Sequence, residues 1–310
     1  MDRNTVNWRG YIPAITTPFD KNGAFDPAMM KQLLEWLHGE GMHGLVTAGT
    51  TGEWFSLEPD EFAALLGCVG DAMAGKLTLI AGCNAFTAKQ AIEKAKLAAA
   101  CSFDGILLTP PPYVVPTERE ITNFYRTVSD AVDLPICVYN WPPGTNIDMS
   151  IDLLEQLTDI DKVVAVKNST GDLAHFVRVF FALKDKVRIF GFTMDEFGAT
   201  LIEHHGGDGT MGAGAILGHD QPDFYNHLWS GRRTEALACG AKDRVIMTEL
   251  FNSDYSSKVG SPQALFKEAL NLQGLPGGYP RPPLLPLTPE QSLRVRETLM
   301  SLGRIGDDAV

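Results

Sequence analysis

The stretch Val163-Val164-Ala165-Val166-Lys167 is a short apolar run that ends in a charged residue. Its four aliphatic residues follow one another without alternating polar residues, which is typical of a parallel strand buried on both faces. Similar runs, rich in Val, Ile and Leu, recur on both sides of it along the chain. We therefore predict eight strands, at residues 11–17, 45–48, 77–83, 105–109, 136–139, 163–167, 187–190 and 210–213.

Segments with helical patterns and recognisable helix starts separate these runs. Asp26-Pro27 supplies an N-cap followed by a proline at the first helical position, and Thr87 and Thr117 begin capping-box patterns. Alternation of strand and helix predicts a parallel sheet with right-handed crossovers, and eight such units close a barrel. The predicted fold class is α/β, a (β/α)8 TIM barrel. A doubly wound open sheet is the alternative.

The strand pattern stops after about Trp229, and three helical patterns follow at 235–251, 261–272 and 289–302. Between the last two, the glycine- and proline-rich residues 274–283 predict an extended strap. We predict a catalytic (β/α)8 barrel at 1–232 and a C-terminal helical extension at 233–310 packed on that barrel. Residues 306–310 are expected to fray.

Composition narrows the classes of function. Of the 310 residues, 45% are hydrophobic and 21% are charged, which is ordinary for a globular protein with a large core. No apolar run is long enough to span a bilayer and the first residues do not resemble a signal peptide, so we expect no membrane partner and a cytoplasmic location. The net charge of −12 disfavours nucleic acid. The five cysteines lack a C-x-x-C pattern and are expected to be buried, reduced thiols.

Two apparent ligand motifs are more consistent with structural roles. Gly207-x-Gly209-x-x-Gly212 matches a dinucleotide-binding pattern, but here a helix precedes it and a strand follows, the reverse of the required order. His204-His205 would point in different directions from a helix, and no H-E-x-x-H pattern occurs. We therefore expect no metal and no bound cofactor.

Lys167 is the sharpest candidate for chemistry, because barrel active sites lie at the C-terminal ends of strands. A lysine that leaves an apolar strand is either a structural ion pair or a nucleophile. An apolar surround penalises the ammonium form and lowers the pKa. The neutral amine can then attack a ketone and form an imine, an electron sink that allows a neighbouring C–C bond to break or form.

Imine chemistry needs a proton shuttle and a site for the substrate carboxylate, and neighbouring predicted strand ends offer both. Tyr139 ends the strand next to that of Lys167, and Tyr113 follows an earlier strand. Either hydroxyl can transfer a proton; the alternative for each tyrosine is a core aromatic with a satisfied hydroxyl. Gly49, Thr50 and Thr51 offer consecutive backbone N–H groups and two hydroxyls, an anion-binding nest. Simple turn chemistry is the alternative for the two threonines.

Four segments have the order and spacing of one enzyme family. They are Gly-Thr-Thr-Gly-Glu at 49–53, Tyr-Asn-Trp-Pro at 139–142, Lys-Asn-Ser-Thr-Gly-Asp at 167–172 and Arg-Pro-Pro-Leu at 281–284. With these segments the chain resembles the dihydrodipicolinate synthase/N-acetylneuraminate lyase family of Schiff-base class I aldolases. Each segment alone is a modest signal, but together they span the whole barrel and are highly specific.

The resemblance implies roles for the candidate residues. Lys167 would form the imine, and Tyr139 would transfer protons and orient the keto acid. Thr50 and Thr51 would hold the carboxylate and relay protons, within the loop that begins at Gly49. Tyr113 matches a second tyrosine that often reaches the site of a neighbouring subunit, and the family usually forms a homotetramer, a dimer of dimers.

The second half of the substrate site departs from both known branches of that family. The backbone carbonyl of Met211 would line the pocket. Where the lysine-biosynthetic branch has an arginine for a second carboxylate, this chain has Gly144, and Trp141 adds bulk nearby. Two residues after Gly191, where the sialic-acid branch has an acid for sugar hydroxyls, this chain has Thr193.

We therefore predict a lyase or aldolase acting on pyruvate or a 2-keto acid, with a 2-keto-3-deoxy sugar acid or a hydroxy-2-oxoglutarate-like acid as candidates. Alternatives are 4-hydroxy-tetrahydrodipicolinate synthase, which condenses pyruvate with aspartate semialdehyde, and an imine-dependent dehydratase of a keto-deoxy sugar acid. Two alternatives lack the imine. They are a non-catalytic barrel that binds a keto acid, and a phosphate-binding barrel enzyme using residues 206–214.

Overall fold

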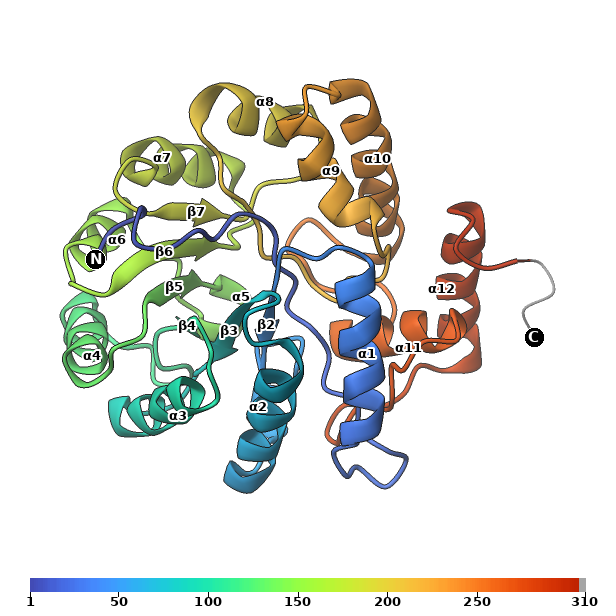
Figure 1. The fold of residues 1–310 in the computed structure, drawn as a ribbon, viewed down its shortest axis with the longest axis horizontal. Coiled ribbons are helices and arrows are strands. Elements are labelled where there is room, and N and C mark those ends of the chain that lie inside the picture. Colours follow the sequence, from blue (N-terminus) through green and yellow to red (C-terminus); the bar gives the residue numbers. More distant parts are fainter. Residues whose placement is uncertain (307–310) are drawn as a thin grey trace.

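The computed structural model describes residues 1–306 and contains one parallel sheet rolled into a barrel (Figure 1). Its strands lie side by side in the order β1-β8-β7-β6-β5-β4-β3-β2. The ring closes at Ala14, whose backbone pairs with Val46 on one side and Ala213 on the other. This closure confirms the predicted (β/α)8 barrel over the open sheet. The strands are β1 (Gly10–Tyr11), β2 (Gly44–Thr47), β3 (Thr78–Gly82), β4 (Gly105–Leu108), β5 (Ile136–Asn140), β6 (Val163–Asn168), β7 (Arg188–Phe190) and β8 (Gly209–Thr210).

Helices surround the barrel, and several begin where the sequence predicts. The Asp26 side chain accepts hydrogen bonds from the backbone of the first helical turn, and Thr117 forms the full capping box with Glu120. Thr87 makes only half of its box, accepting from Gln90 N. The helices are α1 (Pro27–Gly39), the 3₁₀ turn η1 (Trp54–Ser56), α2 (Pro59–Met73), α3 (Ala88–Ala100), α4 (Glu118–Ala131), α5 (Pro142–Thr145), α6 (Ile151–Thr158), α7 (Leu173–Leu183), α8 (Glu196–His205) and α9 (Asp220–Trp229).

The first and last strands are much shorter than the predicted segments 11–17 and 210–213. Beyond Tyr11, Ile12 N and Ala14 N still donate to Thr210 O and Gly212 O, but the strand pairing continues only as an isolated bridge at Ala14. After β8, Gly214 adopts a φ of +78°, which turns the chain away from the barrel wall. Both segments therefore become irregular at the mouth of the barrel.

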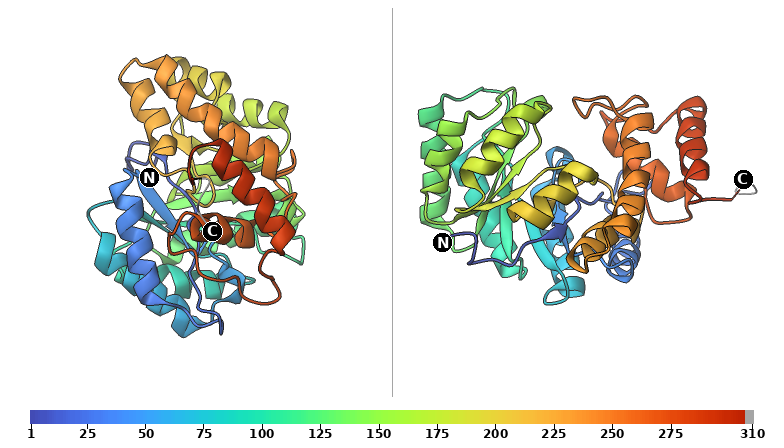
Figure 2. Two further views of the ribbon diagram at one scale, coloured as in Figure 1. Left: turned by 90° about the vertical axis from the view of Figure 1, so that its right-hand side faces the viewer. Right: turned by 90° about the horizontal axis from the view of Figure 1, so that it is seen from above.

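Three helices follow the barrel, namely α10 (Arg233–Leu250), α11 (Pro262–Leu272) and α12 (Pro289–Ser301). Figures 1 and 2 show them gathered on one side of the molecule, away from the N-terminus and from α4 and α6. The strap after α11 returns to the barrel, where Tyr279 N donates to Phe19 O at 2.9 Å. The division at residues 232 and 233 stays a proposal, and most of the segment expected to fray, 307–310, lies outside the described residues.

The interior of the barrel is packed with side chains, and a cavity lies at its mouth. Trp8 lies at the opposite end, where its indole abuts Gly105, a position at which an added Cβ would come within 2.4 Å of the ring. Tyr139 and Met211 belong to the same interior cluster and lie beside the mouth cavity. The cluster comprises Val6, Trp8, Ile12, Ala14, Val46, Ile80, Leu107, Cys137, Tyr139, Val164, Ala165, Phe190 and Met211.

Two expectations from composition can be compared with the structure. Within residues 1–306, no helix has the length and apolar character needed to cross a membrane. All five cysteines are unpaired, but only Cys83 and Cys137 are buried, and the other three are half-buried. The prediction of reduced thiols agrees with this arrangement, whereas full burial holds for those two alone.

Candidate active site

The register of two neighbouring strands brings Lys167 and Tyr139 together. Tyr139 of β5 and Lys167 of β6 are direct partners in the parallel ladder. Since paired residues of adjacent strands point to the same face of a sheet, both side chains project toward the barrel mouth. The Lys167 Nζ lies 4.2 Å from the centroid of the Tyr139 ring. The amine therefore lies over an aromatic face rather than beside a carboxylate.

The surroundings of Lys167 favour its neutral form. Its residue surface is only 6% exposed, and burial lowers the pKa of the amine to about 8, with the Cys137 thiol opposing the shift. None of the ion pairs formed by residues 1–306 includes Lys167. A lysine without an acidic partner has a larger fraction of free amine near neutral pH than an ordinary surface lysine.

Burial shifts the pKa of Tyr139 in the opposite direction from that of Lys167. Burial raises the pKa of its hydroxyl well above the ordinary value, and hydrogen bonding with the Ser169 and Thr50 side chains opposes this rise. The phenol therefore keeps its proton at neutral pH and can donate it. Its ring stacks on Trp141, with centroids 5.9 Å apart and planes inclined by 22°. This packing fixes the orientation of the hydroxyl.

The loop after β2 presents Thr50 and Thr51 to the same space. Ala48 and Glu53 at its ends both have a left-handed φ of 55°, which folds the loop tightly between them. Gln263 of α11 donates its Nε2 to the Thr50 carbonyl at 3.1 Å. The loop conformation is thus fixed by its own backbone and by a helix from the C-terminal part of the chain.

A buried ion pair anchors the end of this loop. The Glu53 carboxylate pairs with Lys267 of α11, and the two side chains are 0% and 1% exposed. Lys267 also donates to Tyr279 O at 2.8 Å, and Arg281 N donates to Glu53 Oε2 at 3.0 Å. The Arg281 guanidinium in turn makes a two-pronged contact with Glu61, both bonds 2.7 Å long. The segment around Arg281 therefore helps to fix the loop after β2, residues 49–53, which is called the carboxylate loop below after the role proposed for it.

A cavity of about 430 Å³ at the barrel mouth brings most of the predicted site residues together. Its walls come from the ends of the strands, from α9 and α10, and from the start of α11. The predicted site residues that line it are Gly49, Thr50, Thr51, Tyr139, Lys167, Gly191, Thr193 and Met211.

Tyr113 and Gly144 lie elsewhere. Tyr113 is 90% exposed on the loop after β4, so within a single chain it does not reach the cavity. Gly144 lies in α5 behind Trp141, and a Cβ added there would come within 2.4 Å of the indole Cδ1. The Trp141 ring occupies the space in front of Gly144, and the role of Gly144 in substrate binding stays a prediction.

Sequence reasoning missed four residues that line the cavity. Ser169 follows β6, Gln221 belongs to α9, Asp243 to α10 and Tyr255 to the loop after α10. Burial raises the pKa of Asp243 to about 6; Gln221 opposes the shift by hydrogen bonding, and Asp195 adds to it. No short-range pattern links these residues to the strand ends. The proximity of Ser169 to Lys167 was the one signal that could have found any of them.

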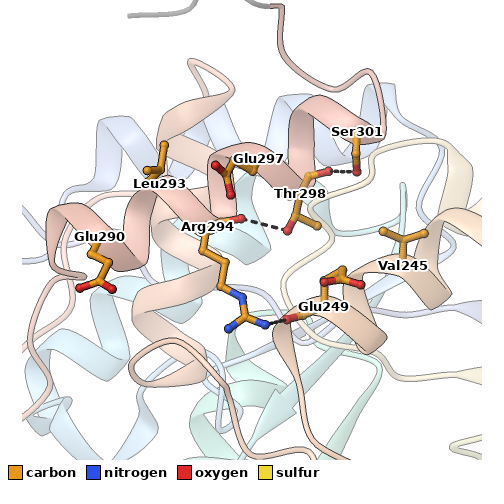
Figure 3. Close-up of a pocket in the computed structure, with 8 residues that line it drawn as sticks. All are labelled: Val245, Glu249, Glu290, Leu293, Arg294, Glu297, Thr298 and Ser301. Atoms are coloured by element: carbon orange, nitrogen blue, oxygen red, sulfur yellow. Dashed lines mark hydrogen bonds between the residues drawn. The ribbon is translucent and has the colours of Figure 1, made fainter.

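A larger hollow, of about 630 Å³, lies between α10 and α12 on the outside of the molecule (Figure 3). Its charged residues are the exposed Glu249, Glu290, Arg294 and Glu297, and the Arg294 guanidinium donates to the Glu249 carbonyl at 2.9 Å. Since this groove is bounded by helix sides and holds no buried ionisable group, we place the candidate site at the barrel mouth. Residues 1–306 contain no group of three or more His, Cys, Asp or Glu arranged to hold a metal ion.

Comparison with known proteins agrees with this geometry. The model of the dihydrodipicolinate synthetase family matches residues 7–302. An uncharacterized DapA-like lyase from Rhizobium meliloti is 31% identical over 299 residues, covering 96% of this chain and 97% of the relative. A 4-hydroxy-tetrahydrodipicolinate synthase from Oceanobacillus iheyensis is 30% identical over 296 residues, covering 95% and 97% of the two chains.

A solved structure shares the fold over the same length. The chloride-inhibited dihydrodipicolinate synthase from Acinetobacter baumannii, complexed with pyruvate, is 28% identical and superposes with a TM-score of 0.84, covering 96% of this chain and 99% of that one. The family match extends over nearly the whole chain, and its relatives are lyases and synthases. The chain therefore belongs to the dihydrodipicolinate synthetase family and is an enzyme of the carbon–carbon lyase class.

Proposed function

We propose that this enzyme is a Schiff-base-forming lyase of 2-keto acids, with Lys167 as the nucleophile. The observation that carries the proposal is the environment of the Lys167 amine. It is buried, its pKa is lowered to about 8, it has no carboxylate partner among residues 1–306, and it lies 4.2 Å from the Tyr139 ring in a cavity. These are the properties that an imine-forming lysine requires.

In the proposed reaction the neutral Lys167 amine adds to the ketone carbon, and the carbinolamine loses water to give a protonated imine. A base removes the proton of the C4 hydroxyl, the C3–C4 bond breaks, and its electron pair moves into the imine to form an enamine. An aldehyde leaves, the enamine carbon takes up a proton, and water releases pyruvate. Tyr139, which keeps its proton at neutral pH, is suited to protonate the hydroxyl that leaves the carbinolamine as water, and the resulting phenolate can then take the proton of the C4 hydroxyl.

Thr50 and Thr51 are proposed to hold the carboxylate of the keto acid. They line the cavity in a loop that is anchored at Glu53, so their hydroxyl and N–H donors are positioned before the substrate arrives. A preorganised donor set does not have to reorganise during the reaction. Met211, Gly191 and Thr193 would form the remaining wall beside the reacting carbons.

The synthase reaction with aspartate semialdehyde is the second candidate, and the similarity to a 4-hydroxy-tetrahydrodipicolinate synthase favours it. The sequence opposes it, because Gly144 stands where the lysine-biosynthetic branch has the arginine for its second carboxylate, and the Trp141 ring lies directly against Gly144. We expect weak condensation of pyruvate with aspartate semialdehyde in a coupled assay. Condensation as efficient as retro-aldol cleavage would favour the synthase. An imine-dependent dehydratase shares the first steps and differs in eliminating water from the substrate.

We also propose a homotetramer in which Tyr113 serves a neighbouring subunit. Tyr113, Val114 and Val115 expose 90%, 66% and 47% of their surfaces on one loop, and exposed apolar clusters often mark interfaces. Light scattering of the purified protein would determine the number of subunits, and Tyr113→Phe would report whether its hydroxyl contributes to turnover. A cytoplasmic location remains a prediction.

Borohydride trapping tests the proposed function directly. Treatment with pyruvate and borohydride should add one reduced pyruvyl group to Lys167, located by peptide mass spectrometry. Lys267→Arg serves as a control for the second buried lysine, because it retains a cation opposite Glu53 and should still be labelled at Lys167. Absence of an adduct with pyruvate and with every other short 2-keto acid would exclude imine chemistry and leave a non-catalytic keto-acid-binding barrel.

A further inference from the structure

The cavity has a second polar end, across the barrel from the Tyr139 wall. In the closed ring, β1 lies four strands from β5 in either direction, so the wall beside β1 faces the wall that carries Tyr139. Tyr11 of β1 lines the cavity on that side, together with Gln221 of α9 and Asp243 of α10. Because α9 packs against β1, this polar end is part of the barrel assembly itself.

Close packing of α10 fixes Asp243 at the cavity wall. A Cβ added at Gly240 would come within 1.9 Å of the Met194 carbonyl oxygen, so the helix backbone directly abuts the loop after β7. Asp243 lies one helical turn after Gly240 and Ile246 one turn later, on the same face of the helix. Both Asp243 and Ile246 line the cavity. The carboxylate is thus carried by a rigid element rather than by a loop.

Gln221 presents an acceptor without a matching donor, next to the Asp243 carboxylate. Gln221 donates its Nε2 to Asp243 Oδ1 at 3.0 Å, and this bond orients the amide. The other amide atom, Oε1, is buried and has no hydrogen-bond partner among the described residues, although the residue is only 3% exposed. Leaving a buried acceptor without a donor is energetically unfavourable. This end of the cavity therefore suits a ligand that brings hydrogen-bond donors.

The charges around the cavity specify the kind of donor. Among the described residues that line it, Lys167 is the one cation, whereas Asp243 and Asp254 are acids. Lys167 is occupied by the ketone carbon once the imine forms. A second carboxylate on the substrate would then face acids with no guanidinium or imidazole nearby. Neutral hydroxyl groups would donate to both Asp243 and Gln221 without that repulsion.

We propose that Asp243 and Gln221 form a subsite for hydroxyl groups at the far end of the substrate, so that this enzyme acts on a 2-keto acid with a neutral polyhydroxylated tail rather than on a dicarboxylate. The inference rests on the imine chemistry proposed above and narrows its substrate class. The cavity volume of about 430 Å³ is within the range of sites for ligands larger than pyruvate.

Substrate comparison tests the subsite. The panel contains 2-keto-3-deoxygluconate and 2-keto-3-deoxygalactonate, which carry the tail in both C4 configurations, 4-hydroxy-2-oxoglutarate as the dicarboxylate, and 4-hydroxy-2-oxopentanoate, which has no tail hydroxyl beyond C4. Consumption is followed by mass spectrometry, which records cleavage and dehydration alike. We expect kcat/KM for one of the sugar acids to exceed that of the two other acids by about tenfold or more, the effect of one or two charge-assisted hydrogen bonds.

Variants assign that preference to the two residues. Asp243→Asn keeps the side-chain volume, and Gln221→Met removes the accepting oxygen at similar length; each should lower kcat/KM for the sugar acid by about tenfold to a hundredfold, mainly through KM. Turnover of 4-hydroxy-2-oxopentanoate, which has no tail hydroxyl to bind there, should fall much less, so the ratio of the two kcat/KM values should drop, and pyruvate should still be trapped at Lys167. Glu249→Gln, on the outer face of the same helix (Figure 3), is the matched control and should leave every substrate unaffected.

The outcomes distinguish failure of the proposed subsite from failure of the imine-forming function on which it rests. Best turnover of 4-hydroxy-2-oxoglutarate by the wild type, or an undiminished sugar-acid preference in both folded variants, would overturn the subsite while pyruvate trapping at Lys167 persists. Failure of trapping would instead remove the imine, and with it the basis of the subsite. Thermal unfolding of each variant distinguishes loss of the subsite from loss of the fold.

Discussion

Lys167 and Lys267 are both buried lysines whose pKa is lowered to about 8 by burial, yet their surroundings differ. Lys267 pairs with Glu53, which opposes the shift, and donates to the Tyr279 carbonyl. Lys167 lies over the Tyr139 ring with an open cavity beside it and takes part in none of the ion pairs of residues 1–306. A shifted pKa therefore does not separate a reactive lysine from a structural one, whereas the partner of the amine does.

The difference also has an energetic meaning. An ammonium buried without a partner is unfavourable, and the imine chemistry proposed for Lys167 would explain why an unpaired amine is kept there. A buried pair such as Glu53–Lys267 contributes little net stability, but removing one member leaves an uncompensated charge. Substitution of each lysine by an apolar residue should therefore change stability in opposite directions.

The largest expected effect is the loss of activity in Lys167→Met. Without the amine no imine can form, and turnover should fall by at least about 10⁴-fold, as is typical when a covalent nucleophile is removed. At neutral pH the same variant should be as stable as the wild type or more stable, since a buried cation without a partner is replaced by an apolar side chain. Steady-state kinetics and thermal unfolding on one preparation measure both effects. A variant that remains active would show that Lys167 is not the nucleophile.

Lys267→Met should destabilise the enzyme by about 3–5 kcal/mol, because Glu53 would remain buried without its cation. Denaturant unfolding measures this change. The double variant Glu53→Gln/Lys267→Met removes both charges and should recover part of the lost stability. If the single variant is as stable as the wild type, the pair is not the anchor of the carboxylate loop that we describe.

The contrast between the two lysines also marks what the sequence could predict. Lys167 and Tyr139 could be placed at one site because buried apolar runs fix the strand ends, and parallel strand ends meet at one edge. Lys267 and Glu53 are separated by 214 positions, and no local pattern connects a lysine in a helix of the extension to the loop after β2. For the same reason, nothing in the sequence could place Asp243 of α10 at the barrel mouth. The barrel could be predicted, whereas the contacts of the extension with its mouth depend on tertiary packing.

The pH dependence of activity sharpens the comparison further. Since the pKa of Lys167 is about 8, its amine is mostly protonated at pH 7 and mostly neutral at pH 9. The value of kcat/KM should therefore rise by about tenfold between these two pH values and level off above them. A flat profile in this range would mean that another step limits the rate or that the amine is already neutral at pH 7.

Stability should depend on pH through the same group. The folded pKa of Lys167 is about 8 and the ordinary value is 10.5, so between these values the unfolded chain binds more protons and stability rises with pH. Relative to Lys167→Met, the wild type should gain up to about 3 kcal/mol across this window. Denaturant unfolding of both proteins at pH 7.5 and pH 10.5 isolates the contribution of this one residue.

The smallest expected effect concerns the link between the Lys267 helix and the reactive site. Gln263→Leu removes the 3.1 Å hydrogen bond from Nε2 to the Thr50 carbonyl but leaves the Glu53–Lys267 pair intact. Loss of one such bond should cost about 1 kcal/mol. If α11 positions the carboxylate loop, this loss should appear mainly as a KM for the keto acid that is raised by about fivefold, with kcat changed less. An equal fall in unfolding free energy with no change in KM would instead assign Gln263 to folding alone, and the influence of α11 on the site would then act through Glu53 only.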